Sequence, residues 1–200
     1  MSTVWFTADI HLGHRFVADL RGYGNPDDHD AELMSNLHND TRPGDVIWIL
    51  GDISSGGAIG QRNALAHLAE LRDAGRTLHL IAGNHDGVHP MHRRALRWDG
   101  EYREVFTSVQ PFARRRINGA KVWLSHFPWR GGGDHTEHDR YETVRLNDDG
   151  TSWLLHGHTH SSERADWPRR MIQVGVDAWD GHPVSMNALA NFMGLTPQAY

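Results

Sequence analysis

The chain has 200 residues, a length typical of one domain, and its 38% hydrophobic content with eight tryptophans excludes an intrinsically disordered protein. The lack of cysteine excludes disulfides and thiolate metal sites, so imidazole, carboxylate and amide groups are the available ligands, with sixteen histidines among them. A net charge of −5 argues against a protein that coats nucleic acid, although it leaves room for a local basic groove.

Two further features of the chain bear on location and domain organisation. The longest apolar run near the middle, residues 46–50, is far too short to span a membrane, and no secretory signal precedes Asp9. No linker, repeat or low-complexity tract divides the sequence. We therefore expect a single domain over residues 1–200, cytoplasmic and without a membrane partner.

The N-terminal half alternates predicted strands and helices. Strands are predicted over residues 3–8, 46–51 and 77–82, where short apolar runs end in Gly, Asp or Asn. Helical patterns cover residues 28–40, with acidic residues in the first turn, and 59–74, with an apolar stripe. This alternation is typical of βαβ units and predicts an α/β fold with a largely parallel sheet.

The second half opens with a predicted hairpin. Asn118-Gly119 is a strong two-residue turn signal and joins residues 112–117 to 120–124 as antiparallel strands. With Ile117 opposite Ala120, one face is apolar apart from Arg115, which a bulge or an acidic partner would explain.

Other elements complete the second half. Strands are predicted over residues 121–125, 152–156 and 171–176. Ser185 can cap a helix that runs to Met193. Residues 131–150 are polar and Gly-rich, which predicts a long loop of the kind that contacts substrate beside an active site.

Polar side chains follow five predicted strands at the point where each strand ends. In open α/β sheets such ends meet at one edge, and we expect extended backbone there to pair Asp9 with His11 and His158 with His160. Seven donors are too many for one tetrahedral ion, but with one bridging carboxylate they supply four bonds to each of two divalent ions. The donors are Asp9, His11, Asp52, Asn84, His126, His158 and His160.

The order of these residues resembles a known family. Its pattern is Asp9-x-His11, Gly51-Asp52, Gly83-Asn84-His85-Asp86, His126 and Gly157-His158-x-His160. The pattern is similar to that of the calcineurin-like metallophosphoesterases, and the chain looks most like their small bacterial and phage members. The resemblance implies a sandwich of two mixed β-sheets flanked by helices, a dinuclear metal centre and phosphoester hydrolysis.

The resemblance also implies a role for each residue. Asp9, His11 and His160 would hold the first ion, and Asp52 would bridge it to a second ion held by Asn84, His126 and His158. His85 would contact the phosphate and protonate the leaving oxygen, while Asp86 would orient His85. The donors admit manganese, iron, zinc, nickel or cobalt.

Further residues are candidates for substrate contact because they lie near the predicted site loops. They are His14, Arg15, Arg130 and Trp179, together with the loop residue His135. His156 precedes the last motif and is expected to pack or support rather than ligate, because the donor count is already complete.

We therefore expect a phosphodiesterase that hydrolyses small substrates such as cyclic nucleotides by in-line attack of a metal-bound hydroxide, with phosphomonoesters as side substrates. The alternatives are a nuclease that acts on DNA or RNA, and a non-catalytic scaffold whose metal site binds a protein partner. The sequence leaves open the oligomeric state and whether the loop over residues 131–150 moves.

Overall fold

The computed structural model describes residues 2–195. Strands and helices alternate through the N-terminal half, as predicted, because apolar β-branched runs are separated by segments with a helical stripe. In chain order this half contains β1 (Val4–Thr7), α1 (Arg15–Leu20), α2 (Pro26–Asp40), β2 (Val46–Ile49), α3 (Ala58–Asp73), β3 (Thr77–Ile81), η1 (Ala95–Arg97) and α4 (Asp99–Val105).

The second half contributes the remaining strands and short helices. They are β4 (Ser108–Gln110), β5 (Phe112–Ile117), β6 (Ala120–Ser125), η2 (Glu142–Val144), β7 (Trp153–His156), β8 (Ala165–Asp166), β9 (Met171–Gln173), η3 (Val176–Ala178), β10 (Val184–Ser185) and α5 (Met186–Phe192). The first sheet has the order β10-β1-β2-β3-β4 and is parallel except for β10. The second has the order β5-β6-β7-β9-β8, parallel at its centre and antiparallel at both edges. Both sheets are mixed, as expected.

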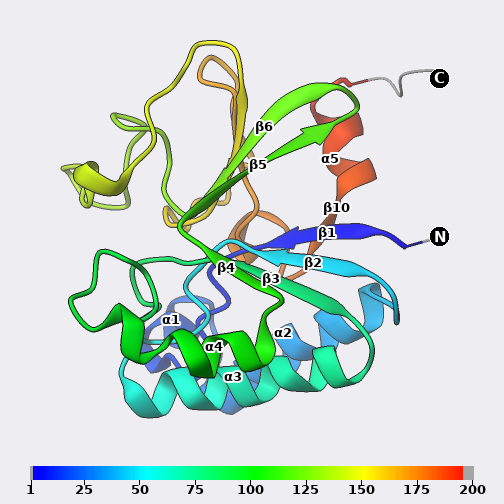
Figure 1. Ribbon diagram of the computed structural model, residues 1–200, viewed down its shortest axis with the longest axis vertical. Helices are drawn as coiled ribbons and strands as arrows, with labels where there is room; N and C mark the ends of the chain where they lie inside the picture. Colours follow the sequence, from blue (N-terminus) through cyan, green and yellow to red (C-terminus); the bar gives the residue numbers. More distant parts are fainter. Residues whose placement is uncertain (1, 196–200) are drawn as a thin grey trace.

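The two sheets pack face to face, and helices α2, α3 and α4 cover the outer face of the first sheet (Figure 1). Alternation along β2 shows how one strand serves two cores: Ile47 and Ile49 pack with the helices, whereas Trp48 packs between the sheets. Helix α5 adds Leu189 to the inter-sheet core. Burial on both faces explains why these strands are nearly continuous in apolar residues.

The β5–β6 hairpin has the predicted register, with Ile117 opposite Ala120. The expectation of a bulge or an acidic partner for Arg115 is wrong. Its guanidinium lies over the ring of Trp48, 5.4 Å from the centroid, so an aromatic face of the first sheet compensates the charge. The hairpin and the first sheet are therefore joined by a cation–π contact.

Caps define the ends of two helices. Helix α2 begins earlier than predicted, at Pro26, because the side chain of Asn25 accepts a hydrogen bond from the Asp28 amide. Ser185 caps α5 as expected, accepting from the Ala188 amide. Among residues 2–195, no helix combines the length and the apolar character needed to cross a bilayer.

Candidate metal centre

The loops that follow β1, β2, β3, β6 and β7 meet at one edge of the sandwich and interlock. The amide of Asp9 donates to the carbonyl of Gly51 at 3.0 Å, which ties the loop after β1 to the loop after β2. The amide of His158 donates to the Asp9 carboxylate at 2.9 Å, which ties in the loop after β7. Residues far apart in sequence are thus held together by the backbone itself.

Several of the predicted ligands have left-handed backbone conformations. The φ angles are 57° at Asp9, 47° at His11, 55° at Asp52, 73° at His158 and 50° at His160. The prediction that extended backbone pairs Asp9 with His11 and His158 with His160 is therefore wrong. Asp and His tolerate this region better than most residues, and the turn it produces sends neighbouring side chains in different directions.

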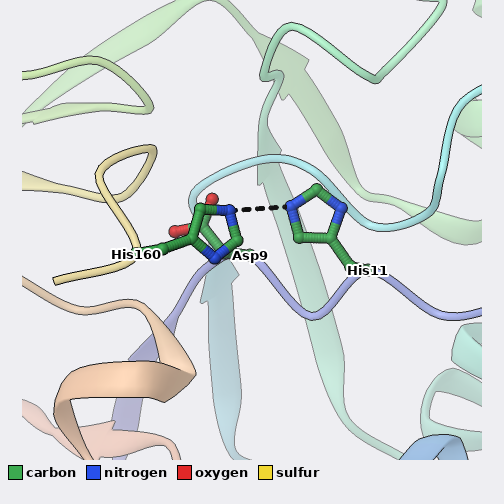
Figure 2. A group of neighbouring side chains, drawn as sticks. All are labelled: Asp9, His11 and His160. Atoms are coloured by element: carbon green, nitrogen blue, oxygen red, sulfur yellow. Dashed lines mark hydrogen bonds between the residues drawn. The ribbon is translucent and has the colours of Figure 1, made fainter. Parts of the chain in front are cut away.

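The first group of donors consists of Asp9, His11 and His160, whose coordinating atoms all lie within 4.8 Å of one another. Figure 2 shows the two imidazoles facing each other, with 3.2 Å between their Nε2 atoms. Each outer nitrogen, Nδ1, faces an acceptor: the Ser54 carbonyl at 3.2 Å for His11 and the Asp177 carboxylate at 3.0 Å for His160. Because both Nδ1 atoms carry hydrogens, two Nε2 lone pairs converge, and this arrangement fits a cation.

The second group consists of Asn84, His126 and His158. The amide oxygen of Asn84 lies 3.1 Å from His126 Nε2 and 3.0 Å from His158 Nδ1. The outer nitrogens again face acceptors, the Leu50 carbonyl at 2.8 Å for His126 and the Asp134 carboxylate at 2.9 Å for His158. Once His126 Nε2 has lost its proton, lone pairs converge here as well, and the donors suit a divalent cation.

Asp52 lies between the two groups. One carboxylate oxygen, Oδ2, is 3.4 Å from His126 Nε2 and 3.8 Å from His11 Nε2. Asp52 also forms a cluster with Asp9 and His126 whose coordinating atoms lie within 4.8 Å. Its position places a buried negative charge where it can serve both groups.

The electrostatics of the centre reflect burial opposed by close charges. Burial, together with the charge on His126, lowers the pKa of His158 to about 3. Burial also disfavours a charged His126, yet the Asp52 carboxylate outweighs it and raises the pKa of His126 to about 9. Conversely, His126 holds the pKa of Asp52 below its usual range despite burial, whereas burial raises the pKa of Asp9. In the absence of a cation, a proton on His126 therefore balances the negative charge of Asp52.

Glycines before two of the ligands are required by close packing. A Cβ on Gly51, whose φ is 91°, would lie 2.5 Å from His126 Nδ1. A Cβ on Gly157 would lie 2.5 Å from a carboxylate oxygen of Asp9. Only glycine lets these loops approach the donors so closely.

Sequence reasoning missed the support for His160. Asp177, in η3, accepts a hydrogen bond from each of two guanidinium nitrogens of Arg21, at 2.8 and 2.7 Å, and this guanidinium also donates to the Asp9 carbonyl. Although Asp177 is partly buried, its bonds to Arg21 and His160 hold the pKa of its carboxyl well below the usual range. The signal that could have found Asp177 is its position directly after the strand predicted over residues 171–176, where the other donors likewise follow their strands.

The support for His158 was missed as well. Asp134, in the loop over residues 131–150, contacts Arg145 at 2.7 Å and Arg140 at 3.0 Å, and the side chains of Asp134 and Arg145 are fully buried. Asp134, His135 and His158 also lie close enough together to hold an ion. Two guanidinium groups already neutralise that carboxylate, which argues against a further cation at this place.

His85 and Asp86 both lie at the centre. We expected a contact between their side chains, but they do not form one. The Asp86 carboxylate accepts hydrogen bonds from three backbone amides, those of Asp52, Ile53 and Gly83. His85 Nδ1 lies 3.3 Å from the carbonyl of Ser55 instead. The expected orientation of His85 by Asp86 is therefore wrong: Asp86 fixes the loop that carries Asp52. Burial, together with the charge of Asp52, raises the pKa of Asp86 to about 6.

Five of the seven donors line an open cavity of about 530 Å³: His11, Asp52, Asn84, His158 and His160. Asp9 and His126 are fully buried and are not part of its lining. His14, His85 and His135 line it, together with the exposed apolar side chains of Phe16 and Leu20. The size is typical of a small-molecule site.

The remaining candidates lie elsewhere. Arg15 pairs with Asp19 and Arg130 with Glu142, and neither lines the cavity. Trp179 lies under the guanidinium of Arg164 and donates to a backbone carbonyl, also outside the cavity. His156 is buried, with Nδ1 2.8 Å from the Gly157 carbonyl, as expected for a packing role, and burial lowers its pKa to about 4.

Comparison with known proteins identifies the family. A family model described as the calcineurin-like phosphoesterase superfamily domain matches residues 4–175. The chain is 43% identical over 189 residues to the Gene 66 protein of Mycobacterium phage L5, covering 90% of this chain and 88% of that protein. It is 45% identical over 186 residues to the Gene 66 protein of Mycobacterium phage D29, covering 90% of each.

The fold has a counterpart among solved structures. A protein of unknown function from Aquifex aeolicus superposes with a TM-score of 0.69 at 21% identity, covering 96% of this chain and 100% of that one. This likeness shows the fold alone. The matched residues 4–175 make up most of the chain and include the imidazole and carboxylate clusters. The protein therefore belongs to the calcineurin-like phosphoesterase superfamily.

Proposed function

We propose that the protein is a phosphodiesterase that hydrolyses small phosphodiesters such as cyclic nucleotides and uses two divalent cations. The observation that carries the proposal is the convergence of imidazole, amide and carboxylate lone pairs in two adjacent groups at an open cavity. Such paired sites are suited to an in-line displacement at phosphorus.

The ligand assignment follows the two groups. Asp9, His11 and His160 would hold one cation and Asn84, His126 and His158 the other, with Asp52 shared between them. Bound there, divalent cations would polarise the phosphoryl oxygens and lower the pKa of water. The outer hydrogen bonds of the four histidines fix which nitrogen faces the cation.

His85 would act on the substrate directly. Its Nδ1 faces the Ser55 carbonyl, which leaves Nε2 to address the substrate, and its ring lies 5.3 Å from the ring of His11. The protonated imidazole would donate a hydrogen bond to the phosphoryl group and then pass its proton to the leaving oxygen. An alkoxide leaving group needs this proton far more than an aryl oxide does.

The apolar rim supports a nucleotide over a bare phosphate ester. Phe16 and Leu20 are 65% and 71% exposed and line the cavity. An exposed aromatic ring beside a phosphate-binding centre offers a surface on which a base can stack, as aromatic side chains do in other nucleotide-binding proteins.

Three substrates and one variant test this function. We expect the metal-loaded protein to hydrolyse bis(p-nitrophenyl) phosphate and 2′,3′-cyclic AMP faster than p-nitrophenyl phosphate, and to lose all activity on chelation. His85→Ala should slow cyclic AMP hydrolysis by about 10²–10⁴-fold and the aryl diester by less. Equal losses on both diesters would refute the acid role of His85. Absence of turnover with any metal would refute the enzymatic function and favour a scaffold.

A further inference from the structure

A second cavity, of about 510 Å³, adjoins the metal centre. It shares Asn84 and His85 with the first cavity, so the two meet at the imidazole proposed to protonate the leaving group. Its other lining includes His92, Arg93 and Arg94, from the loop between β3 and η1. A group that leaves past His85 has this cavity beside it.

The loop that builds the second cavity is firmly attached to the centre. His92 Nε2 lies 3.0 Å from the carbonyl of Asn84, an acceptor, so the ring donates to the backbone of a proposed ligand. The amide of Gly87 donates to the Gln61 side chain at 2.6 Å, and the same oxygen accepts from the buried Tyr102 hydroxyl. The arginines that follow His92 are therefore presented from a fixed backbone.

The charge of the second cavity is positive and uncompensated. None of its lining residues, all of which belong to the described part of the chain, is acidic. Arg93 and Arg94 are exposed and form no ion pair with residues 2–195, whereas nearby Arg62 and Arg103 are paired with carboxylates. In a chain of net charge −5, two free guanidinium groups at the site favour an anionic ligand there.

An aromatic side chain completes the cavity. Trp98, between η1 and α4, also lines it and is partly buried, with the guanidinium of Arg62 5.3 Å from its ring centroid. Guanidinium groups beside an aromatic face are a combination suited to the phosphates and bases of nucleotides. The first cavity, by contrast, contains the carboxylates of Asp52 and Asp177.

We propose that the second cavity binds a further phosphate carried by the leaving group, so that the substrate is a phosphodiester linking a nucleoside to a phosphorylated nucleoside, as in a short oligonucleotide. This inference rests on the proposed function and narrows its substrate class. In the reaction, water forms the new bond to phosphorus, the bond to the leaving oxygen breaks, and His85 supplies the proton to that oxygen. Arg93 and Arg94 hold the phosphate at the far end of the leaving nucleotide.

Dinucleotides with and without a terminal phosphate test the inference. We would measure kcat/KM for cleavage of the central diester in d(TpT), d(pTpT) and d(TpTp), with products separated by chromatography. One of the two phosphorylated substrates, the one whose phosphate lies on the leaving side, should be cleaved about tenfold faster than d(TpT), the effect of one charge-assisted hydrogen bond. The double variant Arg93→Ala/Arg94→Ala should reduce that ratio to about one.

A matched control removes the same charge elsewhere. Arg114 and Arg116 lie exposed on the edge strand β5 and line neither cavity. Arg114→Ala/Arg116→Ala should keep the tenfold ratio. Equal cleavage of all three substrates by the wild type, or an unchanged ratio in the Arg93/Arg94 variant, would overturn the inference.

The same proteins separate this inference from the proposed function. If the wild type cleaves neither d(TpT) nor bis(p-nitrophenyl) phosphate, the proposed function fails. Calorimetric titration with the three dinucleotides then still tests phosphate binding by the second cavity. The inference is supported if the wild type binds one phosphorylated dinucleotide more tightly than d(TpT) and Arg93→Ala/Arg94→Ala does not. Equal binding of all three by both proteins refutes it.

Discussion

The two halves of the candidate metal centre are supported in different ways. In the half that contains Asp9, His11 and His160, the outer nitrogen of His160 bonds to Asp177, which Arg21 holds with two hydrogen bonds. In the half that contains Asn84, His126 and His158, the outer nitrogen of His158 bonds to Asp134. Asp177 lies in a short helix packed on the sandwich, whereas Asp134 lies in a long loop.

This difference shows that a long polar loop can act as a structural support. The loop over residues 131–150 buries Arg145, whose guanidinium contacts Asp134, Asp139 and two backbone carbonyls. A buried charge is costly unless all its partners are present, so the loop conformation and the orientation of His158 depend on each other. The hydrogen bond that orients His160 comes instead from Asp177, outside this loop.

The largest expected effect comes from removing the residue that the halves share. Asp52→Ala should release both cations and lower activity by about a thousandfold, because several kcal/mol of transition-state stabilisation depend on them. Metal content by elemental analysis and hydrolysis of bis(p-nitrophenyl) phosphate measure this. Asp19→Ala, an exposed carboxylate paired with Arg15, is the control and should change neither. A fully metallated, active Asp52→Ala protein would disprove the shared role.

A pair of variants separates the halves. Asp177→Asn should weaken one cation site and Asp134→Asn the other, each by about 10–100-fold, because each carboxylate orients one histidine ligand. Equilibrium dialysis should then find one tight and one weak site in each variant. Loss of both sites to the same extent in either protein would contradict independent support.

The same two variants should differ in the stability of the loop over residues 131–150. Asp134→Asn leaves the buried Arg145 without its full charge partner and should lower the free energy of unfolding by about 2 kcal/mol. It should also speed proteolytic cleavage within residues 131–150. Asp177→Asn should leave the cleavage rate unchanged, and faster cleavage in that variant would show that the loop depends on both halves.

The pH dependence of metal affinity follows from His126. Its pKa of about 9 means that the metal-free protein carries a proton there at pH 7, and a cation must displace it. Affinity at this half should therefore rise about tenfold per pH unit up to pH 9. In the metal-free protein, stability from the charged imidazole is present below the unfolded pKa of about 6.5 and is lost as pH rises through 9. Calorimetry in two buffers would detect the released proton, and a flat profile would contradict the assignment.

The smallest effect is expected at His135. Its side chain is 41% exposed and lies beside Asp134 and His158, so these three residues could be mistaken for a ligand set. Because Arg140 and Arg145 neutralise Asp134, we expect His135→Ala to change metal affinity by less than about threefold. A loss of tenfold or more by equilibrium dialysis would place His135 among the ligands.

Sequence predicted the strands and the gathering of the donors because both depend on local patterns. Apolar runs that end in Asp, Asn or His mark buried parallel strands and their carboxyl ends, and the structure brings these ends together. The short strands β4, β8 and β10 were missed because two or three residues carry no periodicity. Strand β10 pairs with β1, which is distant in sequence, whereas β8 pairs with the neighbouring strand β9.

The supporting contacts could not be predicted, since they depend on tertiary placement. Nothing in the local sequence distinguishes Asp134 or Arg145 from solvated loop residues, yet both side chains are buried. Arg115 was recognised as an exception on its strand, but its partner, Trp48, belongs to the other sheet. His85 was found as a family residue, whereas its contact with Ser55 instead of Asp86 depends on how the loops after β2 and β3 meet.

The long separation between donors along the chain has a consequence for the order of events during synthesis. His160 and its partner Asp177 emerge from the ribosome long after Asp9. Contacts between such distant residues form late and slow down folding. A nascent chain therefore lacks a complete donor set until the chain from Asp9 to His160 has been made. We expect the folded protein to acquire metal, rather than metal to guide its folding.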